Sequence, residues 1–290
     1  MQRLLPALAL TFNAFVWGVS WWPFRALEGQ GLHPLWATAL IYLLSLGCLL
    51  AAKPAAWRGF ARQPLLWLLL ASAGLTNLGF NWAVTVGDVV RVVLLFYLMP
   101  LWTVLLAWPL LGEKPHPASL ARMALALAGV VIVLKAPQSP WPWPDSAADW
   151  LALIAGLSFA LTNIVLRKLH AAPAASRVMA MFGGGALMAT GAALLGMTQG
   201  VVNPPPLPMA AWVVLAVLLS LAFLAGNLAM QYGATRLSAH GTALIMLSEV
   251  VFASASSVAL DAAELSSRIW LGGGLILLAA LLSALSSDTH

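Results

Sequence analysis

The sequence predicts an all-α integral membrane protein, with ten transmembrane helices arranged as two inverted five-helix repeats. Three observations predict this fold class. Hydrophobic residues make up 62% of the 290 residues and charged residues only 8%, whereas a soluble domain carries about 25% charged residues. The apolar residues form ten runs that are long enough to cross a bilayer. A nine-residue motif in the first half of the chain also recurs in the second half.

The ten apolar runs are continuous rather than alternating. Because lipid tolerates no unpaired backbone, this pattern favours helices over the strands of a membrane barrel. The first run has no small-residue cleavage site, so we expect it to be retained as a helix. The runs cover residues 4–24, 34–52, 64–85, 89–111, 117–135, 149–168, 174–198, 209–233, 239–260 and 268–286.

The basic residues predict the orientation of these helices. The net charge is +5. Because the Lys and Arg residues lie in short loops between apolar runs, they indicate contact with lipid headgroups rather than with nucleic acid. With both termini in the cytoplasm, ten Lys and Arg residues lie on the cytoplasmic side and four on the other. This asymmetry follows the positive-inside rule, so we expect both termini to be cytoplasmic.

The internal repeat divides the chain. The sequence "NLGFNWAVT" at 77–85 reappears as "NLAMQYGAT" at 227–235, an offset of 150 residues. A second, weaker match aligns "WGVSWWPFRAL" at 17–27 with "FALTNIVLRKL" at 159–169. Because five is odd, a second five-helix unit must cross the bilayer in the opposite direction, which is typical of transporters with a site between their halves. The predicted units are residues 1–135, a Pro- and Trp-rich extracytoplasmic linker at 136–148, and residues 149–290.

This pattern resembles the drug/metabolite transporter superfamily, and within it the EamA-type ten-helix exporters. The resemblance rests on Trp17-Gly18 midway along the first run, Pro100 in the fourth, "LLGEKP" at 110–115, and the duplicated unit. It implies the drug/metabolite transporter fold and a bacterial inner-membrane exporter that works by alternating access. The first, third, fourth, sixth, eighth and ninth spans would line a central cavity, and the fifth and tenth would pack outside it. The second half departs from this pattern, because Val250 stands where the first half has Pro100.

The resemblance also implies a substrate class. The fourteen tryptophans and the amides within the spans are most similar to the aromatic amino acid exporters of that superfamily. We therefore expect export of a small amphipathic metabolite, with an aromatic amino acid favoured. A passive channel-like facilitator and an exporter of other amino acids or of cationic drugs stay open as alternatives. The expected partners are the lipid bilayer and this substrate, with no nucleic acid and no cofactor; monomer and homodimer both stay open.

One stripe of the first span combines polar and aromatic side chains. Asn13, Trp17, Ser20 and Trp21 recur at helical spacing. A polar end, a flat aromatic wall and a hydroxyl suit a zwitterion with an aromatic side chain, so we predict that these four residues bind the substrate. For Trp21, the alternative is a place in the aromatic belt at the membrane interface.

Amides form the second group of predicted substrate-binding residues. Asn77 and Asn81 lie one helical turn apart, and Asn227 and Gln231 repeat this spacing in the second half. Asn163 is a single amide in the sixth span. An amide both donates and accepts hydrogen bonds, so it can bind an ammonium or a carboxylate without carrying a charge. The alternative is that these amides join neighbouring helices.

The fourth and ninth spans carry the remaining candidates. Tyr97 and Trp102 flank Pro100, where the missing backbone donor predicts a kink, and we include both among the substrate-binding residues. Glu249 is the only carboxylate deep within a predicted span, which makes it the candidate for coupling export to protons. A hydrogen-bonded packing role is the alternative.

No catalytic residue and no metal site is predicted. An integral membrane enzyme needs acids, histidines or metal ligands clustered near one face of the membrane. The five histidines are scattered along the chain, and the single cysteine, Cys48, excludes an intramolecular disulfide. The sequence therefore argues against a membrane enzyme.

Two further patterns receive a structural interpretation. Asp145 and Asp149 stand at a predicted helix start and are interpreted as capping residues, and Arg91 is expected to pair with Asp88. Glycine triplets at 183–185 and 272–274 indicate close contacts between helices.

Overall fold

The computed structural model describes residues 4–112, 117–134, 144–234, 236, 245–246, 248–262 and 266–285. The regular elements in this part of the chain are helices. They are α1 (Leu4–Val19), α2 (Trp21–Gly29), α3 (Pro34–Ala52), η1 (Ala56–Arg58), α4 (Gly59–Arg62), α5 (Leu65–Val86), α6 (Val89–Phe96), α7 (Met99–Leu111), α8 (Pro117–Leu134), α9 (Ala147–Lys168), α10 (Ala174–Thr198), α11 (Ala210–Ala234), α13 (Ser248–Ala259) and α14 (Ser267–Leu285). Residues 113–115 of the motif at 110–115, most of the linker at 136–148, and the last residue of the repeat at 227–235 lie outside the described residues.

These helices agree with the predicted membrane-spanning runs. Two shorter apolar helices, Leu120–Val133 and Ser267–Ala279, lie within α8 and α14, and α13 falls within the run predicted at 239–260. Each predicted run therefore contains a helix in the described part of the chain, and the protein is an all-helical membrane protein. Seven helical segments are long and apolar enough to cross a bilayer: Leu4–Gly29, Pro34–Ala52, Leu65–Val86, Val89–Leu111, Ala147–Lys168, Ala174–Thr198 and Ala211–Gly233.

Two of the spans are interrupted near their middle. Between α1 and α2, the backbone N–H and the hydroxyl of Ser20 both donate to the carbonyl oxygen of Trp17, at 3.2 and 2.8 Å. Between α6 and α7, the helix stops at Tyr97 and restarts so that Pro100 lies in the first turn of α7. Proline fits the first turn because the donor that it lacks has no intrahelical acceptor there. The kink predicted at Pro100 is thus an interruption at Tyr97 and Leu98, just before the proline, and its counterpart Val250 is helical and buried in α13.

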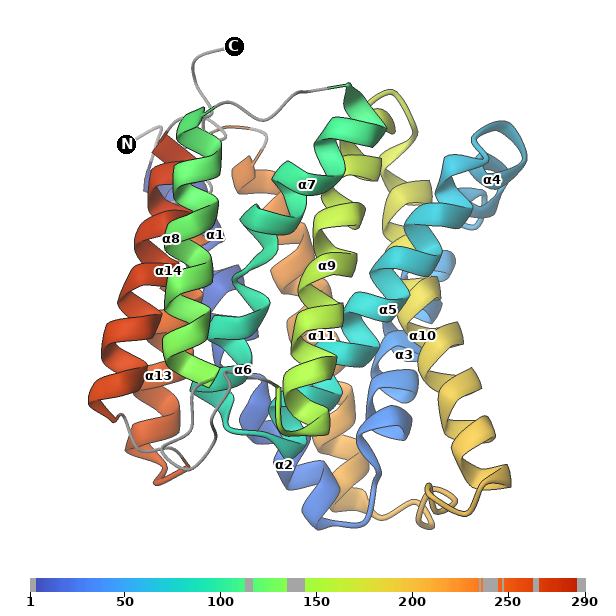
Figure 1. Ribbon diagram of the computed structural model, residues 1–290. Helices are drawn as coiled ribbons and strands as arrows, with labels where there is room; N and C mark the ends of the chain where they lie inside the picture. Colours follow the sequence, from blue (N-terminus) through green and yellow to red (C-terminus); the bar gives the residue numbers. More distant parts are fainter. Residues whose placement is uncertain are drawn as a thin grey trace.

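The spans form a bundle whose two edges are helix pairs (Figure 1). α8 and α14 lie side by side at one edge, and α3 and α10 pack together at the other. α1, α5, α9, α11 and the interrupted span α6–α7 lie between these pairs, while α1 begins and α14 ends on the same side of the molecule. The fifth and tenth predicted spans, α8 and α14, therefore occupy an edge of the bundle.

The helix contacts between the two halves come in matched pairs. α1 packs against α11 and α13, and in the same way α9 packs against α5 and against α6 and α7. The pairs α3 with α10, α8 with α14, and α6 with α13 each join one helix of the first half to one of the second. Exchanging the halves therefore leaves the contact pattern largely unchanged.

The glycine triplets mark close contacts, as the sequence predicted. A Cβ added at Gly184 would overlap the carbonyl oxygen of Leu70 on α5. A Cβ added at Gly272 would come within 2.7 Å of the carbonyl oxygen of Gly129, where α14 crosses α8. Any larger residue would push these helices apart, so glycine is required for the observed approach.

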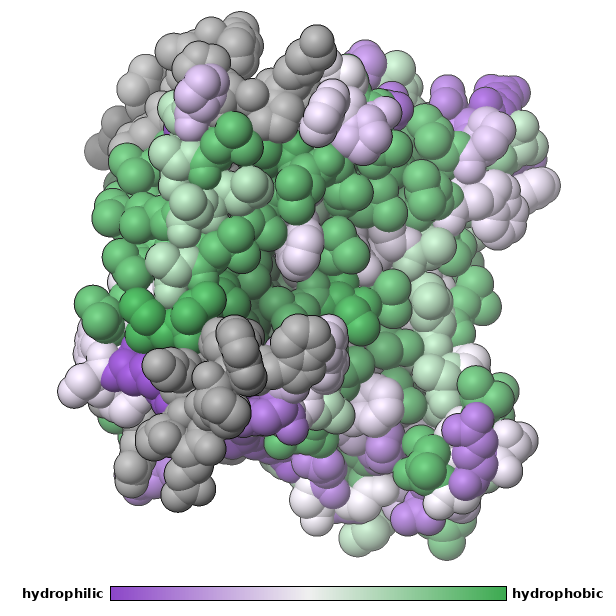
Figure 2. Space-filling view, in the orientation of Figure 1, coloured by the Kyte–Doolittle hydropathy of each residue, from purple (hydrophilic) through white to green (hydrophobic). Residues whose placement is uncertain are grey.

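Hydrophobic residues form a band across the middle of the face shown in Figure 2, and polar residues gather at the two ends of this face. Large side chains such as Leu8, Leu194, Leu218 and Leu228 are more than half exposed on the described surface. Such a surface would be unfavourable in water, and it fits the hydrocarbon core of a bilayer.

Candidate transport site between the helices

Aromatic rings form a continuous chain across the centre of the bundle. Trp17 on α1 stacks on Phe223 of α11 with the ring centroids 4.5 Å apart, and its edge contacts Phe80 of α5 at 6.3 Å. On one side the chain continues through Tyr42 (6.0 Å from Phe223) to Phe182 (5.6 Å further), and on the other through Phe96 (4.8 Å from Phe80) to Phe159 (5.3 Å further). Each ring comes from a different helix, so the chain joins α10, α3, α11, α1, α5, α6 and α9.

Trp17 occupies the centre of this aromatic chain. It is half-buried and packs against both of the larger hydrophobic clusters in the described part of the molecule. The next residue, Gly18, lets α13 approach α1, because a Cβ there would lie 2.7 Å from the carbonyl oxygen of Glu249. The Trp17-Gly18 pair thus combines a central ring with the crossing point of α1 and α13.

Tyr97 and Glu249 meet across this crossing. The hydroxyl of Tyr97 lies 3.1 Å from Oε2 of Glu249 and 3.0 Å from the carbonyl oxygen of Met246. Both side chains are buried, with 2% of Tyr97 and 7% of Glu249 exposed. Tyr97 stands at the break between α6 and α7, and Glu249 in the first turn of α13, so the bond joins the predicted fourth and ninth spans. The bond therefore lies where a relative movement of these two spans would act on it.

Asn13 lies beside this pair and is incompletely satisfied. Its Nδ2 lies 3.5 Å from the sulfur of Met246 and 3.7 Å from that of Met230. Its Oδ1 is buried and has no hydrogen-bond partner. A buried acceptor without a partner is destabilising. The Oδ1 of Asn13 can therefore accept a hydrogen bond from a ligand donor such as an ammonium group.

The predicted amides divide into two kinds. Asn77 on α5 and Asn163 on α9 are half-buried, and neither side chain makes a hydrogen bond with the described residues. Asn81 is fully buried and donates to the hydroxyl of Thr38 at 3.3 Å, while its Oδ1 has no partner. In the second half, Gln231 donates to Oδ1 of Asn227 at 2.8 Å. Asn81, Asn227 and Gln231 therefore join helices or each other, whereas Asn77 and Asn163 stay available to a ligand.

Other predicted residues are engaged within the protein. The hydroxyl of Ser20 bonds within its own turn, as described above. The indole N–H of Trp21 donates to Ser256 on α13 at 2.9 Å, and the guanidinium of Arg25 lies over its ring at 5.1 Å. Only 3% of Trp21 is exposed, which places it in the core rather than in an interfacial belt.

Trp102, by contrast, is not engaged through its polar atom. The indole nitrogen of Trp102 is buried without a partner, so this residue keeps a free donor.

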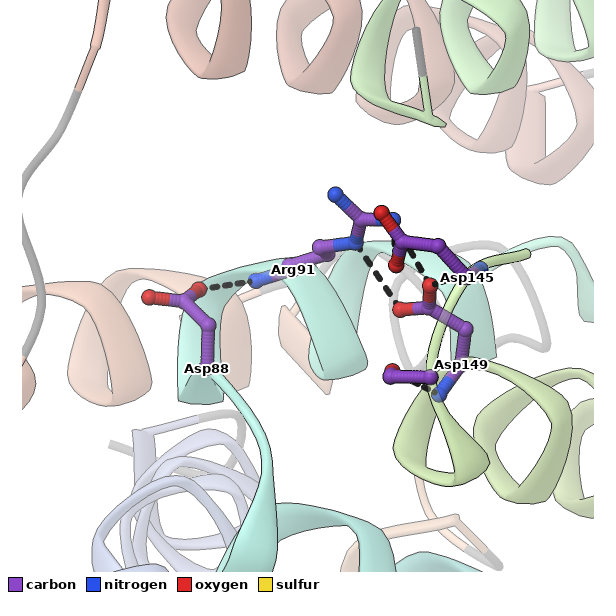
Figure 3. A network of polar contacts seen from close by, with 5 residues as sticks. Asp88, Arg91, Asp145 and Asp149 are labelled. Carbon is purple, nitrogen blue, oxygen red and sulfur yellow. Dashed lines mark hydrogen bonds and ion pairs between the residues drawn. The ribbon is translucent and has the colours of Figure 1, made fainter. Parts of the chain in front are cut away.

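An ionic network joins the start of α6 to the start of α9 (Figure 3). Arg91 of α6 forms two hydrogen bonds with the carboxylate of Asp149 on α9, at 2.6 and 2.8 Å, and contacts Asp145 at 3.1 Å. Asp88 instead accepts from the backbone N–H of Arg91 at 2.8 Å and so caps α6. Ser146, whose hydroxyl accepts from the backbone N–H of Asp149, caps α9.

This network corrects two predictions. The side chain of Arg91 pairs with Asp149 and Asp145 rather than with Asp88, and Asp149 is an ion-pair partner rather than a cap. The reason is geometric: the helix start orients the carboxylate of Asp88 towards free backbone donors, whereas Asp149 lies on a neighbouring helix within reach of the guanidinium. On the same side, Arg25 of α2 donates to the carbonyl oxygens of Thr85 and Gly87.

Comparison with known proteins decides the family. The EamA-like transporter family matches the chain twice, over residues 4–135 and 146–285. The chain belongs to this family. The membership confirms the predicted EamA resemblance, and because this is a family of transporters and not of enzymes, it confirms that the protein is not an enzyme.

One relative and one solved structure extend this result. The uncharacterized transporter PA0485 of Pseudomonas aeruginosa is 26% identical over 160 residues, which cover 53% of this chain and 51% of that protein. The chain thus aligns with about half the length of this curated relative. A crystal structure of another protein matches 98% of this chain and 97% of its own, with a TM-score of 0.59 and 19% identity. This likeness shows that the EamA protein shares its fold with that structure.

Most of the aromatic chain was not predicted from the sequence. Phe80, Phe96 and Phe223 lie inside apolar runs, where an aromatic residue gives no contrast in polarity with its neighbours. Phe159 carried a signal, because the weaker repeat match aligns it with Trp17. Among the described residues of this EamA protein, no group of three or more His, Cys, Asp or Glu side chains could hold a metal ion.

Proposed function

We propose that this EamA-family transporter exports small amphipathic metabolites, and aromatic amino acids in particular, across a bacterial inner membrane by alternating access. The observation that carries the proposal is the chain of aromatic rings centred on Trp17, with half-buried amides on the surrounding helices. A flat apolar ring of the substrate would pack against this wall, because offset and edge-to-face contacts between rings are favourable. The charged ends of the substrate would bind the free amides of Asn77 and Asn163 and the free oxygen of Asn13.

Alternating access requires two halves that can rock about a shared site. The matched helix pairs described above support an inverted repeat, with units at 1–135 and 149–290 joined by a linker at 136–148. In such a repeat, the Tyr97–Glu249 bond lies between the fourth and ninth spans, at the interface where each half meets its counterpart. The remaining predicted site residues, Trp102 and the pair Asn227–Gln231, would complete the lining.

The proposed orientation has both termini in the cytoplasm. Described basic residues at the ends of α3, α9 and α11 and at the starts of α5 and α10 support it, because these helix ends share the side on which α1 begins. Tags on the two ends of the chain, tested for accessibility from outside intact cells, check the assignment. Labelling of either end from outside would contradict it.

Efflux from reconstituted vesicles tests the substrate class. Tryptophan, phenylalanine, threonine and a cationic dye are loaded in parallel, and we expect the first two to leave fastest and with saturation. Equal rates for all four compounds would overturn the aromatic proposal. A rate that rises in proportion to concentration without saturation would favour the passive channel-like facilitator.

Substitutions of two tryptophans, one inside the aromatic chain and one outside it, test the proposed wall. Trp17→Ala removes the central ring and should lower tryptophan efflux by about tenfold, as expected for loss of one good ring contact. Trp22→Ala is the matched control, because Trp22 is 52% exposed on the outside of α2. We expect it to change efflux by less than about twofold on the same scale, since no ring contact of the chain is lost.

Glu249 is the proposed coupling residue. A carboxylate that exchanges a proton whenever the Tyr97 bond opens would link movement of the fourth and ninth spans to the proton gradient. Glu249→Gln keeps the shape and the hydrogen bond but cannot release a proton, so efflux should lose its dependence on pH. Tyr97→Phe serves as the comparison, because it removes the bond and leaves the titrating group in place. An unchanged pH profile in Glu249→Gln would remove Glu249 from this role.

A cationic drug is the second candidate substrate. The observation that favours it is the same buried carboxylate, which contacts the hydroxyl of Tyr97 and could pair with a cation. The cationic dye in the efflux assay distinguishes the two candidates. Dye efflux that exceeds tryptophan efflux and disappears in Glu249→Gln would favour cation export.

A further inference from the structure

A cavity of about 580 Å³ lies on the side of the molecule away from the Arg91 network. One wall comes from the end of α3 and the segment that follows it, η1 and α4, between Ala52 and Gln63. The other wall comes from the start of α10, at Pro173, Ala175 and Ser176. The cavity therefore joins segments that are more than 100 residues apart in the sequence.

Three cations line this cavity. Lys53, Arg58 and Arg62 are all exposed, and the lining contains no Asp or Glu. None of the three side chains forms an ion pair or a hydrogen bond with the described residues, although Arg58 lies 6.0 Å from the ring of Trp57. Three basic residues thus line one cavity whose lining has no acidic residue. An anion placed there would interact favourably with all three.

The walls of the cavity are held together independently of any ligand. The hydroxyl of Ser176 donates to the carbonyl oxygen of Ala56 at 2.7 Å. Gly59 lies so close to Ser176 that a side chain at residue 59 would overlap it. The cavity is therefore preorganised, and binding would not first have to order its backbone.

Two exposed tryptophans indicate the depth of the cavity in the membrane. Trp57 in η1 is 57% exposed, and Trp67 in the first turn of α5 is 59% exposed and contacts Phe60 at 4.9 Å. Exposed tryptophans of membrane proteins concentrate at the level of the lipid headgroups. The cations of the cavity accordingly lie at the depth at which a phospholipid carries its phosphate.

From this juxtaposition of a preformed cavity, three unpaired cations and two interfacial tryptophans, we infer that the cavity binds the phosphate headgroup of an anionic phospholipid. Lys53, Arg58 and Arg62 contact the phosphate, and the exposed tryptophans contact the adjoining glycerol and acyl chains. A free phosphate in solution would find the same cations but no partner for the tryptophans. Occupancy also ties the connection after α3 to the start of α10, so it stabilises this end of the bundle.

Native mass spectrometry of the purified full chain, titrated with phosphatidylglycerol or phosphatidylcholine, tests the inference. Wild-type protein should retain phosphatidylglycerol in preference to phosphatidylcholine. The double variant Arg58→Gln/Arg62→Gln should lower the affinity for phosphatidylglycerol by about 25-fold, the effect of two cations near a lipid surface. The matched control is Lys168→Gln/Arg177→Gln, which removes two charges on the same side but outside the cavity lining, and it should lower the affinity by less than about threefold.

Further arms separate the lipid from free phosphate and from misfolding. Millimolar inorganic phosphate, compared with chloride at equal ionic strength, should not displace the lipid; displacement would make free phosphate the ligand and overturn the assignment. The variant Arg58→Lys/Arg62→Lys preserves the charges and should retain the lipid if the fold is intact. Equal losses in the cavity variant and the matched control, or equal retention of the two lipids by the wild type, would also overturn the inference.

Discussion

α5 and α11 carry the two copies of the repeated motif, yet their surroundings differ. Within the most apolar stretch of each helix, 61% of the residues are buried in α5 and 28% in α11. α5 packs along both α9 and α10, whereas α11 packs mainly along α1 and less extensively along α3. The duplicated sequence therefore specifies the same helix twice with equivalent neighbours, but the extent of packing differs, and the first copy occupies the more enclosed position.

Matched side chains show the same divergence. Asn81 reaches across to Thr38 on α3, while its counterpart Gln231 bonds to Asn227 on its own helix. The aligned aromatic residues, Trp82 and Tyr232, also differ. Trp82 contacts the ring of His33 at 5.5 Å, and the ring of Tyr232 lies 3.9 Å beneath the guanidinium of Arg236.

The interfaces that these helices form with α10 and α3 use different chemistry. α5 meets α10 through Gly74 and Gly184, where a Cβ added at Gly74 would lie 2.5 Å from the carbonyl oxygen of Gly184. α11 meets α3 through a hydrogen bond between the hydroxyls of Ser45 and Ser220 at 2.9 Å. The first interface depends on shape and the second on a polar contact, so substitutions should affect them unequally.

The largest expected effect concerns the ion pair between Arg91, on the helix that follows α5, and Asp149 on α9. Asp149→Asn leaves Arg91 without its buried partner, and because only 2% of the Asp149 side chain and 16% of that of Arg91 are exposed, it should cost about 3 kcal/mol of stability. Thermal unfolding in detergent measures the loss. Asp145→Asn is the control, and since Asp145 is 59% exposed it should cost less than about 1 kcal/mol. Equal losses in the two variants would contradict the assignment of Asp149 as the main partner.

The second prediction tests the glycine contact between α5 and α10. Gly184→Ala should destabilise the protein by about 2 kcal/mol, because the new methyl group overlaps the carbonyl oxygen of Leu70. Gly183→Ala should be nearly neutral, since the nearest atom to its new methyl group would be 4.0 Å away. At the α3–α11 interface, Ser220→Ala should cost only about 0.6 kcal/mol. If Ser220→Ala proved the most damaging of the three, the contrast between the two interfaces would be wrong.

A smaller effect distinguishes the repeated amides. Asn81→Ala removes a fully buried hydrogen bond to Thr38 and should lower stability by about 1 kcal/mol. Gln231→Ala should lower it by only a few tenths of a kcal/mol, because that amide is half-buried on the more exposed helix. Unfolding midpoints of the two variants, measured side by side, check the order. The reverse order would show that burial of α5 does not govern the role of its amides.

The smallest expected effect is the pH dependence at His33, which contacts the aligned residue Trp82. The Nδ1 of His33 accepts from the backbone N–H of Leu35 and caps α3, and burial lowers the pKa of His33 from its ordinary value of 6.5. Because the folded state favours neutral His33, its stabilisation is complete above pH 6.5 and decreases as the pH falls towards the lowered pKa. His33→Asn keeps a capping acceptor that does not titrate. The variant should therefore lose this part of the acid sensitivity, and an unchanged pH dependence would exclude His33 as its source.

Much of the fold could be predicted because the bilayer imposes simple rules on a sequence. Spans need long apolar runs, and the described helices agree with the predicted runs to within a few residues except where α13 is described only from Ser248. The break just before Pro100 follows from the missing backbone donor of proline, a local property of one residue. The candidate site was harder to predict, because Tyr97 and Glu249 are 152 residues apart in the sequence and no local rule brings them together.

The sequence by itself determined the membrane class, the helical spans, the family motifs and the duplicated unit, because hydrophobic length and chain-breaking residues act locally. Only the tertiary structure decided which helices meet, and with them the partner of Arg91, the aromatic chain around Trp17 and the cavity lined by Arg58. In an apolar bundle nearly every face of a helix is hydrophobic, so polarity does not indicate which face is buried. The choice depends instead on the fit of small residues such as Gly18 and Gly184 against neighbouring backbone, which becomes visible only when the helices are packed.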